Sequence, residues 1–357
     1  MTSSKRTKKK PTTKRKRIKL RYLLDVGAGY GRLRRGRGFS YTDLVGNPVT
    51  DAKKLARFRA LVIPPAWQDV WISPSKKGHL QATGIDERGR KQYLYHPDWT
   101  TERQAKKLGR IAAFGKALPR IRRQMATDLR NHTLTKEKVI AIALKTTEET
   151  LIRIGNDQYL RRYGSHGLTT LKKKHVNVSG NETVFRFKGK KGVRQEITIR
   201  NAQLAHHMTV LVGLKGVYLF QYVMEDNGAS YRLRAQDVNA YIRQYAGSQF
   251  SSKDYRTWYA SFWAFRLFAR CGMYASEHEC QENIVSVLDT VSRRLGNTRT
   301  VCKQYYVPDS IVHAYKTGTL AAYLTNPQNG RRLLTKKETE QRLLTFLERA
   351  AVKDSNN

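Results

Sequence analysis

The chain has 357 residues, of which 68 are lysine or arginine and 28 are aspartate or glutamate, so its net charge is +40. This length is enough for two domains with a sizeable core. Because so one-sided a charge makes a compact chain repel itself, the composition favours a polyanionic partner such as nucleic acid over a surface charged only for solubility.

The cysteines and the apolar segments exclude several other classes. Cys271, Cys280 and Cys302 form an odd set without a CxxC spacing, which is typical of reduced intracellular thiols rather than of disulfides or a metal site. No apolar run approaches the roughly 18 residues of a membrane span, and the basic N-terminus lacks the apolar stretch of a secretory signal. We therefore expect no membrane partner and a cytoplasmic location.

The first residues form a strongly basic segment. Residues 1–22 contain eleven lysines and arginines and no acid, a composition that cannot bury a core. We expect a disordered basic tail over 1–22 that adds non-specific affinity for DNA. The second basic stretch, GRLRRGRG at 31–38, lies among glycines and is predicted to be a loop.

Residues 23–99 predict a small β-rich domain. Asp51 is placed to cap a helix that Pro64 ends. The segments WQDVWIS, HLQATGID and RKQYLY alternate and carry aromatic side chains, as strands do. The segment Asp86–Arg90 carries a turn signal between the last two of them.

Residues 100–357 predict a mostly helical domain. Thr101–Gln104 has the pattern of a capping box, Pro119 suits the first turn of a further helix, and residues 136–154 form an amphipathic pattern that ends at Gly155. Three strands are predicted between 168 and 199 around the turn KGKKG. Helices are predicted near 201–213, 236–246, 253–270 and 277–295, and a last one begins at Thr335. The predicted fold class is therefore α+β, with an embedded three-stranded sheet in the helical domain.

Five residues in four local motifs suggest one chemistry. They are Arg153 in LIRIGNDQYL, Lys190 in FRFKGKKG, Arg256 in KDYRTW, and Asn297 and Tyr306 in LGNTRTVCKQYYVPDS. A tyrosine hydroxyl has a pKa near 10, so its attacking form costs about 4 kcal/mol at neutral pH. Guanidinium groups lower this cost and hold the charge that grows on a five-coordinate phosphorus. A phenol, three cations and a neutral amide are thus suited to breaking a phosphodiester without a metal.

The order and local sequences of these motifs resemble the type IB DNA topoisomerases, in the small poxvirus-like form also found in bacteria. The resemblance covers roughly residues 24–325. It implies relaxation of supercoiled double-stranded DNA through transient single-strand cleavage and a 3′-phosphotyrosyl intermediate. No metal, ATP or other cofactor is implied, and the expected form is a monomer that clamps the duplex. The location is then cytoplasmic, nucleoid-associated in a bacterium, or in the virion or viral factory for a virus.

The resemblance also assigns roles to residues. Tyr306 is the nucleophile, Arg153 and Arg256 bind the non-bridging phosphate oxygens, and Lys190 protonates the leaving 5′ oxygen. Asn297 stands where poxvirus relatives have a histidine, and its amide can donate the same hydrogen bond without titrating. Two alternatives remain open at this point. Tyr305 precedes Tyr306, and Lys188 and Lys191 flank Lys190 with equal chemistry.

The strand RKQYLY of the first domain supplies DNA-binding candidates. Residues two apart on a strand share a face, so we expect Arg90 and Gln92 to point together and Tyr93 and Tyr95 to lie on the other face. Arginine and glutamine suit base edges and phosphates. The resemblance places this strand in the major groove, whereas an ordinary half-exposed strand with two packed tyrosines is the alternative.

Two rival functions share some of these features. A tyrosine recombinase uses the same chemistry but usually carries HxxR before its second arginine, where this chain has Lys253–Arg256 as KDYR. A catalytically silent DNA-binding protein would have lost one of the five site positions, and none is clearly lost. The sequence also lacks a GxxxxGK[ST] phosphate loop and an HxH or DxD metal-ligand pattern.

Overall fold

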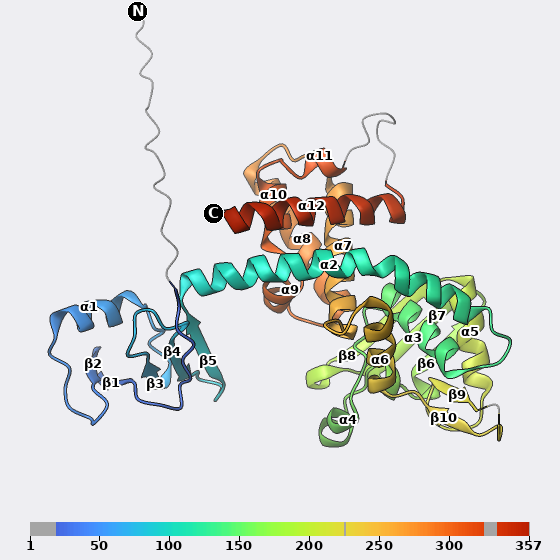
Figure 1. Cartoon of the computed structure of the whole chain (residues 1–357), viewed down its shortest axis with the longest axis horizontal. Coiled ribbons are helices and arrows are strands. Elements are labelled where there is room, and N and C mark those ends of the chain that lie inside the picture. The colour runs from blue at the N-terminus through green and yellow to red at the C-terminus, as the bar shows by residue number, and fades with distance from the viewer. Residues whose placement is uncertain (1–18, 225, 325–333, 357) are drawn as a thin grey trace, which may run out of the picture. The chain divides into compact units, whose positions relative to one another are not determined.

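We describe a computed structural model of the chain, which describes residues 19–224, 226–324 and 334–356 (Figure 1). The chain divides into two compact units. One comprises Met1–Lys106 with Lys353–Asn357, and the other comprises Lys107–Val352. The expected fold class is confirmed, because a small β-rich unit precedes a mostly helical one that contains a three-stranded sheet.

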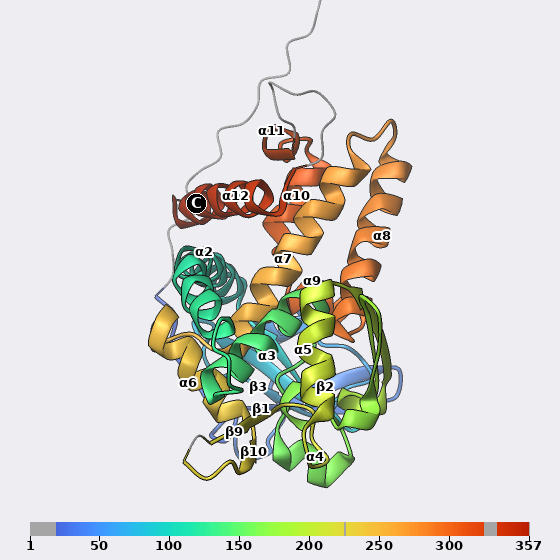
Figure 2. The ribbon, with the colours of Figure 1, turned by 90° about the vertical axis from the view of Figure 1, so that its right-hand side faces the viewer.

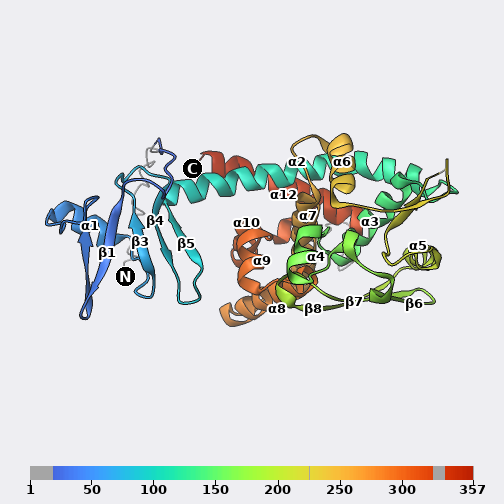
Figure 3. The ribbon, with the colours of Figure 1, turned by 90° about the horizontal axis from the view of Figure 1, so that it is seen from below.

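The N-terminal unit is built on one five-stranded antiparallel sheet. Its strands are β1 (Tyr30–Arg35), β2 (Gly38–Thr42), β3 (Gln68–Ile72), β4 (Leu80–Ile85) and β5 (Lys91–Tyr95), in the order β2-β1-β3-β4-β5. Figure 3 shows β1, β3, β4 and β5 side by side. Helix α1 (Ala52–Ala60) begins at Asp51, whose carboxylate accepts from the backbone N–H of Lys53 and Lys54 as predicted. Phe58 of α1 packs into the small core with Ile72 and Ala82 of the sheet.

The loop predicted over 31–38 is wrong, because these residues form most of the hairpin β1–β2. Arg35 pairs with Gly38 across a two-residue turn in which Gly36 takes a φ of +52°, a conformation that glycine adopts without a steric penalty. The Arg32 guanidinium donates to three carbonyl oxygens, those of Ile63, Pro64 and Trp67, each at 2.9 Å. This arginine therefore holds the unit together, and its charge is not a sign of a loop.

Ordered backbone begins before the predicted end of the basic tail. Residues 1–18 lie outside the described part of the chain. The backbone N–H of Arg21 donates to Lys77 O at 2.8 Å and its carbonyl accepts from His79 at 2.9 Å. Tyr22 stacks on the His79 ring with centroids 4.3 Å apart. Residues 21 and 22 thus belong to the folded unit.

A single long helix, α2 (Pro97–Leu129), replaces the two helices predicted between 101 and 135. Thr101 lies inside it rather than at its start, and Pro119 lies inside it rather than at a first turn. A proline within a helix costs about 3 kcal/mol because it removes one backbone hydrogen bond. Burial of side chains on both sides of Pro119, among them Phe114, Leu118 and Ile121, offsets this cost.

Helix α3 (Lys136–Thr150) ends four residues before the predicted end. Leu151 takes a left-handed φ of 56° and its N–H donates to Thr147 O, which closes the helix. The following residues, among them Arg153, are not helical. They lead into α4 (Asp157–Tyr163) and two 3₁₀ turns, η1 (Leu168–Thr170) and η2 (Lys173–His175).

The embedded sheet has the three predicted strands in the order β6-β7-β8. Their bounds are Val176–Ser179, Glu182–Lys188 and Arg194–Arg200, and the short turn η3 (Lys190–Gly192) joins the last two. Phe185 and Phe187 of β7 enter the core while Arg186 and Lys188 between and after them are exposed, which is the expected alternation of a strand. A second, unpredicted sheet pairs β9 (Gln221–Val223) with β10 (Ser230–Arg232).

The remaining helices complete the second unit. They are α5 (Ala202–Gly213), α6 (Ala235–Ala246), α7 (Ser252–Cys271), α8 (Glu277–Leu295), α9 (Arg299–Tyr305), α10 (Asp309–Lys316), α11 (Ala321–Leu324) and α12 (Lys336–Asn356). Helices α7 and α8 lie side by side (Figure 2). The predicted start of the last helix at Thr335 is confirmed by a capping box, in which the side chains of Thr335 and Glu338 each accept from the other's backbone N–H. Helices α4, α9, α10 and α11 were not predicted.

Candidate active site

Tyr306 stands where helix α9 ends. Its backbone N–H donates to Cys302 O at 3.0 Å, and its carbonyl accepts from Ser261 Oγ of α7 at 3.3 Å. The next residue, Val307, is buried. The backbone of Tyr306 is thus held from both sides, while its ring is only partly buried. Tyr305, by contrast, is 55% exposed.

Arg256 of α7 lies against Tyr306. Its Nη1 is 3.5 Å from the Tyr306 hydroxyl, and its guanidinium carbon is 5.3 Å from the Tyr306 ring centroid. The side chain is anchored by a 2.7 Å hydrogen bond from Nη2 to Leu295 O. Burial lowers the pKa of Arg256, and the nearby Arg153 acts in the same direction, whereas Tyr306 opposes the shift.

Arg153 and Asn297 form the second part of the cluster. The Arg153 guanidinium donates to Asn297 Oδ1 and, at 3.4 Å, to Gly296 O at the end of α8. Burial lowers the pKa of Arg153. Gly296 caps α8 in a left-handed conformation, so the helix ends at Leu295 as predicted. The candidate Asn297 therefore directly follows the residue that caps α8.

The cluster contains hydrogen-bond donors and positive charges that have no partner among the described residues. Among the described residues, Arg256 Nε and Asn297 Nδ2 are buried without a hydrogen-bond partner, and no carboxylate lies within ion-pair distance of Arg153 or Arg256. Buried donors and guanidiniums are normally paired. A set left unpaired around a hydroxyl is suited to bind an anion such as a phosphodiester.

Lys190 lies in the turn η3 and lines the same groove as Arg153. This groove has a volume of about 690 Å³ and extends along Arg153, Asn156, Tyr159, Tyr163, His166, Lys188 and Lys190. Lys190 is exposed, and no contact fixes it to the other four site residues within the described structure. The side chain of Lys191 lies outside the described residues. The structure thus brings together Arg153, Arg256, Asn297 and Tyr306, and leaves Lys190 at the side of the groove.

Two exposed tyrosines in this groove were not predicted from the sequence. Tyr159 and Tyr163 on α4 are each 52% exposed, and their rings stack with centroids 6.0 Å apart. The signal was the i, i+4 spacing in YLRRY, which places both rings on one helix face. Exposed aromatic faces beside lysines and arginines suit stacking and phosphate contacts.

The four candidates of the N-terminal unit lie on and before β5. The Asp86 carboxylate binds both Arg90, at 2.6 Å, and Gln92, at 2.8 Å, so these two side chains do point together. Tyr93 and Tyr95 are 49% and 38% exposed, and their rings are nearly parallel with centroids 6.1 Å apart. The exposed face of β5 therefore carries two aromatic rings. The side chains of Arg90 and Gln92 instead bind the Asp86 carboxylate, in the turn before β5.

Metal-ligand clusters and membrane-spanning helices are both absent from residues 19–224, 226–324 and 334–356. In this part of the chain no group of three or more histidine, cysteine, aspartate or glutamate side chains could hold a metal ion. None of its helices is both long and apolar enough to cross a membrane.

Comparison with known families agrees with this geometry. A family model described as the catalytic core of eukaryotic DNA topoisomerase I matches residues 96–324, and one described as the N-terminal domain of bacterial DNA topoisomerase IB matches residues 38–86. The first match contains all five catalytic candidates. The four DNA-binding candidates on and before β5 fall between the two matched ranges.

Individual relatives are viral. The chain is 31% identical over 306 residues to the DNA topoisomerase 1B of Acanthamoeba polyphaga mimivirus, which covers 84% of this chain and 89% of that protein. It is 28% identical over 119 residues to the DNA topoisomerase 1B of vaccinia virus strain Copenhagen, and this aligned segment covers 33% of this chain and 38% of that protein. The chain belongs to the poxvirus-like and bacterial branch of the type IB DNA topoisomerases, enzymes that act on double-stranded DNA and relax its supercoils.

Proposed function

We propose that Tyr306 is the nucleophile of this topoisomerase. Its oxygen attacks the phosphorus, forms a 3′-phosphotyrosyl bond and expels the 5′ oxygen, and the released 5′ hydroxyl later reverses the exchange. One phosphoester replaces another, so the exchange needs no energy from ATP, and the cations of Arg153, Arg256 and Lys190 are proposed to take the place of a metal. The observation that carries the proposal is the 3.5 Å approach of Arg256 Nη1 to the Tyr306 hydroxyl, because a buried guanidinium there favours the phenolate.

We propose further that Arg153, Arg256 and Asn297 hold the non-bridging oxygens. The buried, unpaired donors Arg256 Nε and Asn297 Nδ2, together with the Arg153 guanidinium, suit the charge that develops on a five-coordinate phosphorus. Asn297 offers Nδ2 because its Oδ1 already accepts from Arg153. An amide donor keeps this role at any pH at which the protein folds.

Lys190 is the proposed general acid for the leaving 5′ oxygen. Its place in an exposed turn lets a flexible side chain reach toward bound DNA, whereas the arginines are fixed by packing. A lysine donates a proton more readily than a guanidinium, because the ordinary pKa of an ammonium group is the lower of the two. Lys188 lines the same groove and is the alternative acid.

The remaining parts of the proposal concern binding. The exposed strand β5, with Arg90, Gln92, Tyr93 and Tyr95, is proposed to contact the duplex, and the enzyme is proposed to act as a monomer that clamps DNA. Its proposed location is where that DNA lies, in the cytoplasm, the nucleoid or a viral factory. The net charge of +40 supports a broad contact with phosphates.

A covalent-adduct assay tests the assignment of the nucleophile. Tyr306→Phe should abolish the protein–DNA adduct while leaving DNA affinity nearly unchanged, because one hydroxyl adds little to an interface dominated by phosphates. Tyr305→Phe is the matched control, since this exposed neighbour makes no contact with Arg256 in the described structure. Loss of the adduct in Tyr305→Phe but not in Tyr306→Phe would contradict the assignment.

A further inference from the structure

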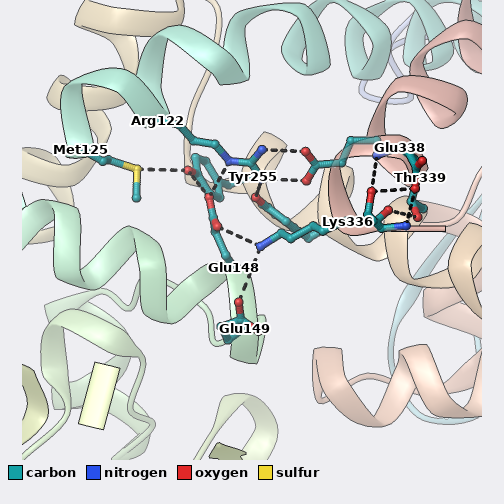
Figure 4. A network of polar contacts seen from close by, with 11 residues as sticks. Arg122, Met125, Glu148, Glu149, Tyr255, Lys336, Glu338 and Thr339 are labelled. Atoms are coloured by element: carbon teal, nitrogen blue, oxygen red, sulfur yellow. Dashed lines mark hydrogen bonds and ion pairs between the residues drawn. The ribbon is translucent and has the colours of Figure 1, made fainter. Parts of the chain in front are cut away.

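A buried ionic network fastens the last helix, α12, to the helices behind the active site. Its centre is Glu148 of α3, whose side chain is only 1% exposed. Arg122 of α2 approaches it at 3.4 Å, Lys336 of α12 at 3.3 Å, and the Tyr255 hydroxyl donates to it at 3.1 Å (Figure 4). Although burial alone raises the pKa of this carboxyl, the Arg122 and Lys336 charges hold it below its ordinary value.

Arg122 connects this carboxylate to α12 a second time. Its Nη1 and Nη2 bind the two oxygens of Glu340 at 2.6 and 2.7 Å, which is a bidentate pair. The same guanidinium donates to the Tyr259 hydroxyl of α7. Four helices, α2, α3, α7 and α12, therefore meet through one arginine, and α12 supplies both Glu340 and Lys336.

The network touches the two segments that carry the arginines of the active site. Glu148 lies on the last turn of α3, five positions before Arg153, and only Leu151 and Ile152 of the buried core separate that helix from it. On α7, Tyr255 precedes Arg256 and Tyr259 follows it by three positions. Fixing the hydroxyls of Tyr255 and Tyr259 sets the rotation of α7 about its axis, and hence the place of the Arg256 guanidinium.

We propose that Glu340 and Lys336 are positioning residues for the cleavage step, and that α12 thereby sets the geometry of Arg153 and Arg256. The inference rests on the proposed function of these arginines. Helix α12 begins after residue 324, where the match to the catalytic-core family ends. Lys336 and Glu340 therefore lie outside the matched range, whereas their partners Arg122, Glu148, Tyr255 and Tyr259 lie within it.

A second ion pair between the same two helices provides a matched control. Lys116 of α2 and Glu348 of α12 lie 2.6 Å apart, but their side chains are 65% and 40% exposed. Within the described structure, no hydrogen bond or ion pair is seen from this pair to α3 or α7. Glu348→Gln and Glu340→Gln thus remove the same charge from the same helix, once at the surface and once at the network.

The test is the single-turnover rate of adduct formation on a suicide duplex, from which the short fragment with the released 5′ hydroxyl diffuses away after cleavage. Glu340→Gln should slow cleavage by about tenfold to a hundredfold, the range expected when reacting groups are displaced by a fraction of an ångström to one ångström. DNA affinity should stay within about twofold, because no DNA-contacting charge is removed. Glu348→Gln should cleave at the wild-type rate, and Lys336→Gln should be slowed like Glu340→Gln.

Thermal unfolding is measured for each variant, and cleavage is assayed below the lowest midpoint. If Glu340→Gln does not fold at any temperature, it is set aside and Lys336→Gln decides by the same criterion. A wild-type rate in the deciding variant, or equal slowing in Glu348→Gln, would overturn the inference. If the wild-type protein itself forms no adduct, the proposed function fails instead.

Discussion

At the scale of single residues, the candidate site contains side chains that packing and hydrogen bonds fix in place, and one, Lys190, for which the described structure shows no such contact. Arg256 is 5% exposed and bonded to Leu295 O, whereas Lys190 stands exposed in a turn. Fixed cations suit charges that must be stabilised at one place, and an exposed lysine with a long side chain suits the transfer of a proton to a leaving group. We therefore predict that a better leaving group can make the lysine unnecessary, but cannot replace the arginines.

Sulfur substitution tests the bypass. Lys190→Ala should slow cleavage of an ordinary 5′-oxygen substrate but regain most of the wild-type rate when the bridging oxygen is replaced by sulfur, because a thiolate leaves without a donated proton. Single-turnover rates on the two substrates measure this, with Lys188→Ala as the parallel variant. Equal slowing of Lys190→Ala on both substrates would move the acid to Lys188 or Lys191.

The sequence predicted the members of the site better than their relations. The motifs around Arg153, Arg256 and Asn297 are local, so a short segment suffices to find them. The hydrogen bond from Arg153 to Asn297 joins residues 144 positions apart. Such contacts depend on how the segments that follow α3 and α8 come together, which no local sequence pattern contains. For Lys190 the structure adds only the shared groove.

At the scale of elements, helix α2 packs closely against α7 at Gly115. A Cβ on Gly115 would come within 2.2 Å of the Trp258 ring, whereas a Cβ on Gly109 of the same helix would meet no atom within 4 Å. Trp258 is 1% exposed. Position 115 is therefore small because an indole occupies the space next to it.

The two glycines predict opposite effects of the same substitution. Gly115→Ala should lower the free energy of unfolding by about 1–3 kcal/mol through overpacking. Gly109→Ala should raise it by about 0.5–1 kcal/mol, because alanine loses less conformational entropy in a helix. Urea denaturation of both variants measures the difference. A stabilised Gly115→Ala would show that Trp258 moves aside freely.

The elements predicted wrongly are those in which tertiary contacts outweigh the local sequence signal. The pattern around Thr101 and Pro119 favours helix ends, yet apolar burial along α2 outweighs both signals. The hairpin β1–β2 was missed because β1 carries three arginines. One of them, Arg32, donates hydrogen bonds to backbone carbonyls of a loop about 30 residues further along the chain. Elements whose caps agree with their packing, such as α8 and α12, were predicted correctly.

At the scale of the whole molecule, charge and catalysis are expected to be separable. Residues 1–18 carry nine lysines and arginines and no acid, and none of the five catalytic candidates lies there. Deleting them spares Arg21, whose backbone pairs with residues 77 and 79. The deletion removes positive charge without removing any interaction of the described fold.

The deletion of residues 1–18 should weaken binding through counterion release alone. Each phosphate that the shortened protein no longer neutralises changes the slope of log affinity against log salt by about 0.9, so the slope flattens by several units if the tail neutralises several phosphates. Relaxation at moderate salt should become less processive, and cleavage within a preformed complex should stay the same. A collapse of the single-turnover cleavage rate would show that the tail helps to build the active site.

Relaxation of plasmids in EDTA and without ATP examines the proposed metal-free phosphotyrosyl mechanism as a whole. The phosphotyrosyl bond stores the energy of the broken strand, and rotation about a single nick has no preferred sense. Positively and negatively supercoiled plasmids should therefore both be relaxed, and Tyr306→Phe should relax neither. A strict requirement for Mg²⁺ or ATP, or removal of negative supercoils alone, would contradict the mechanism built on Tyr306 and Arg256.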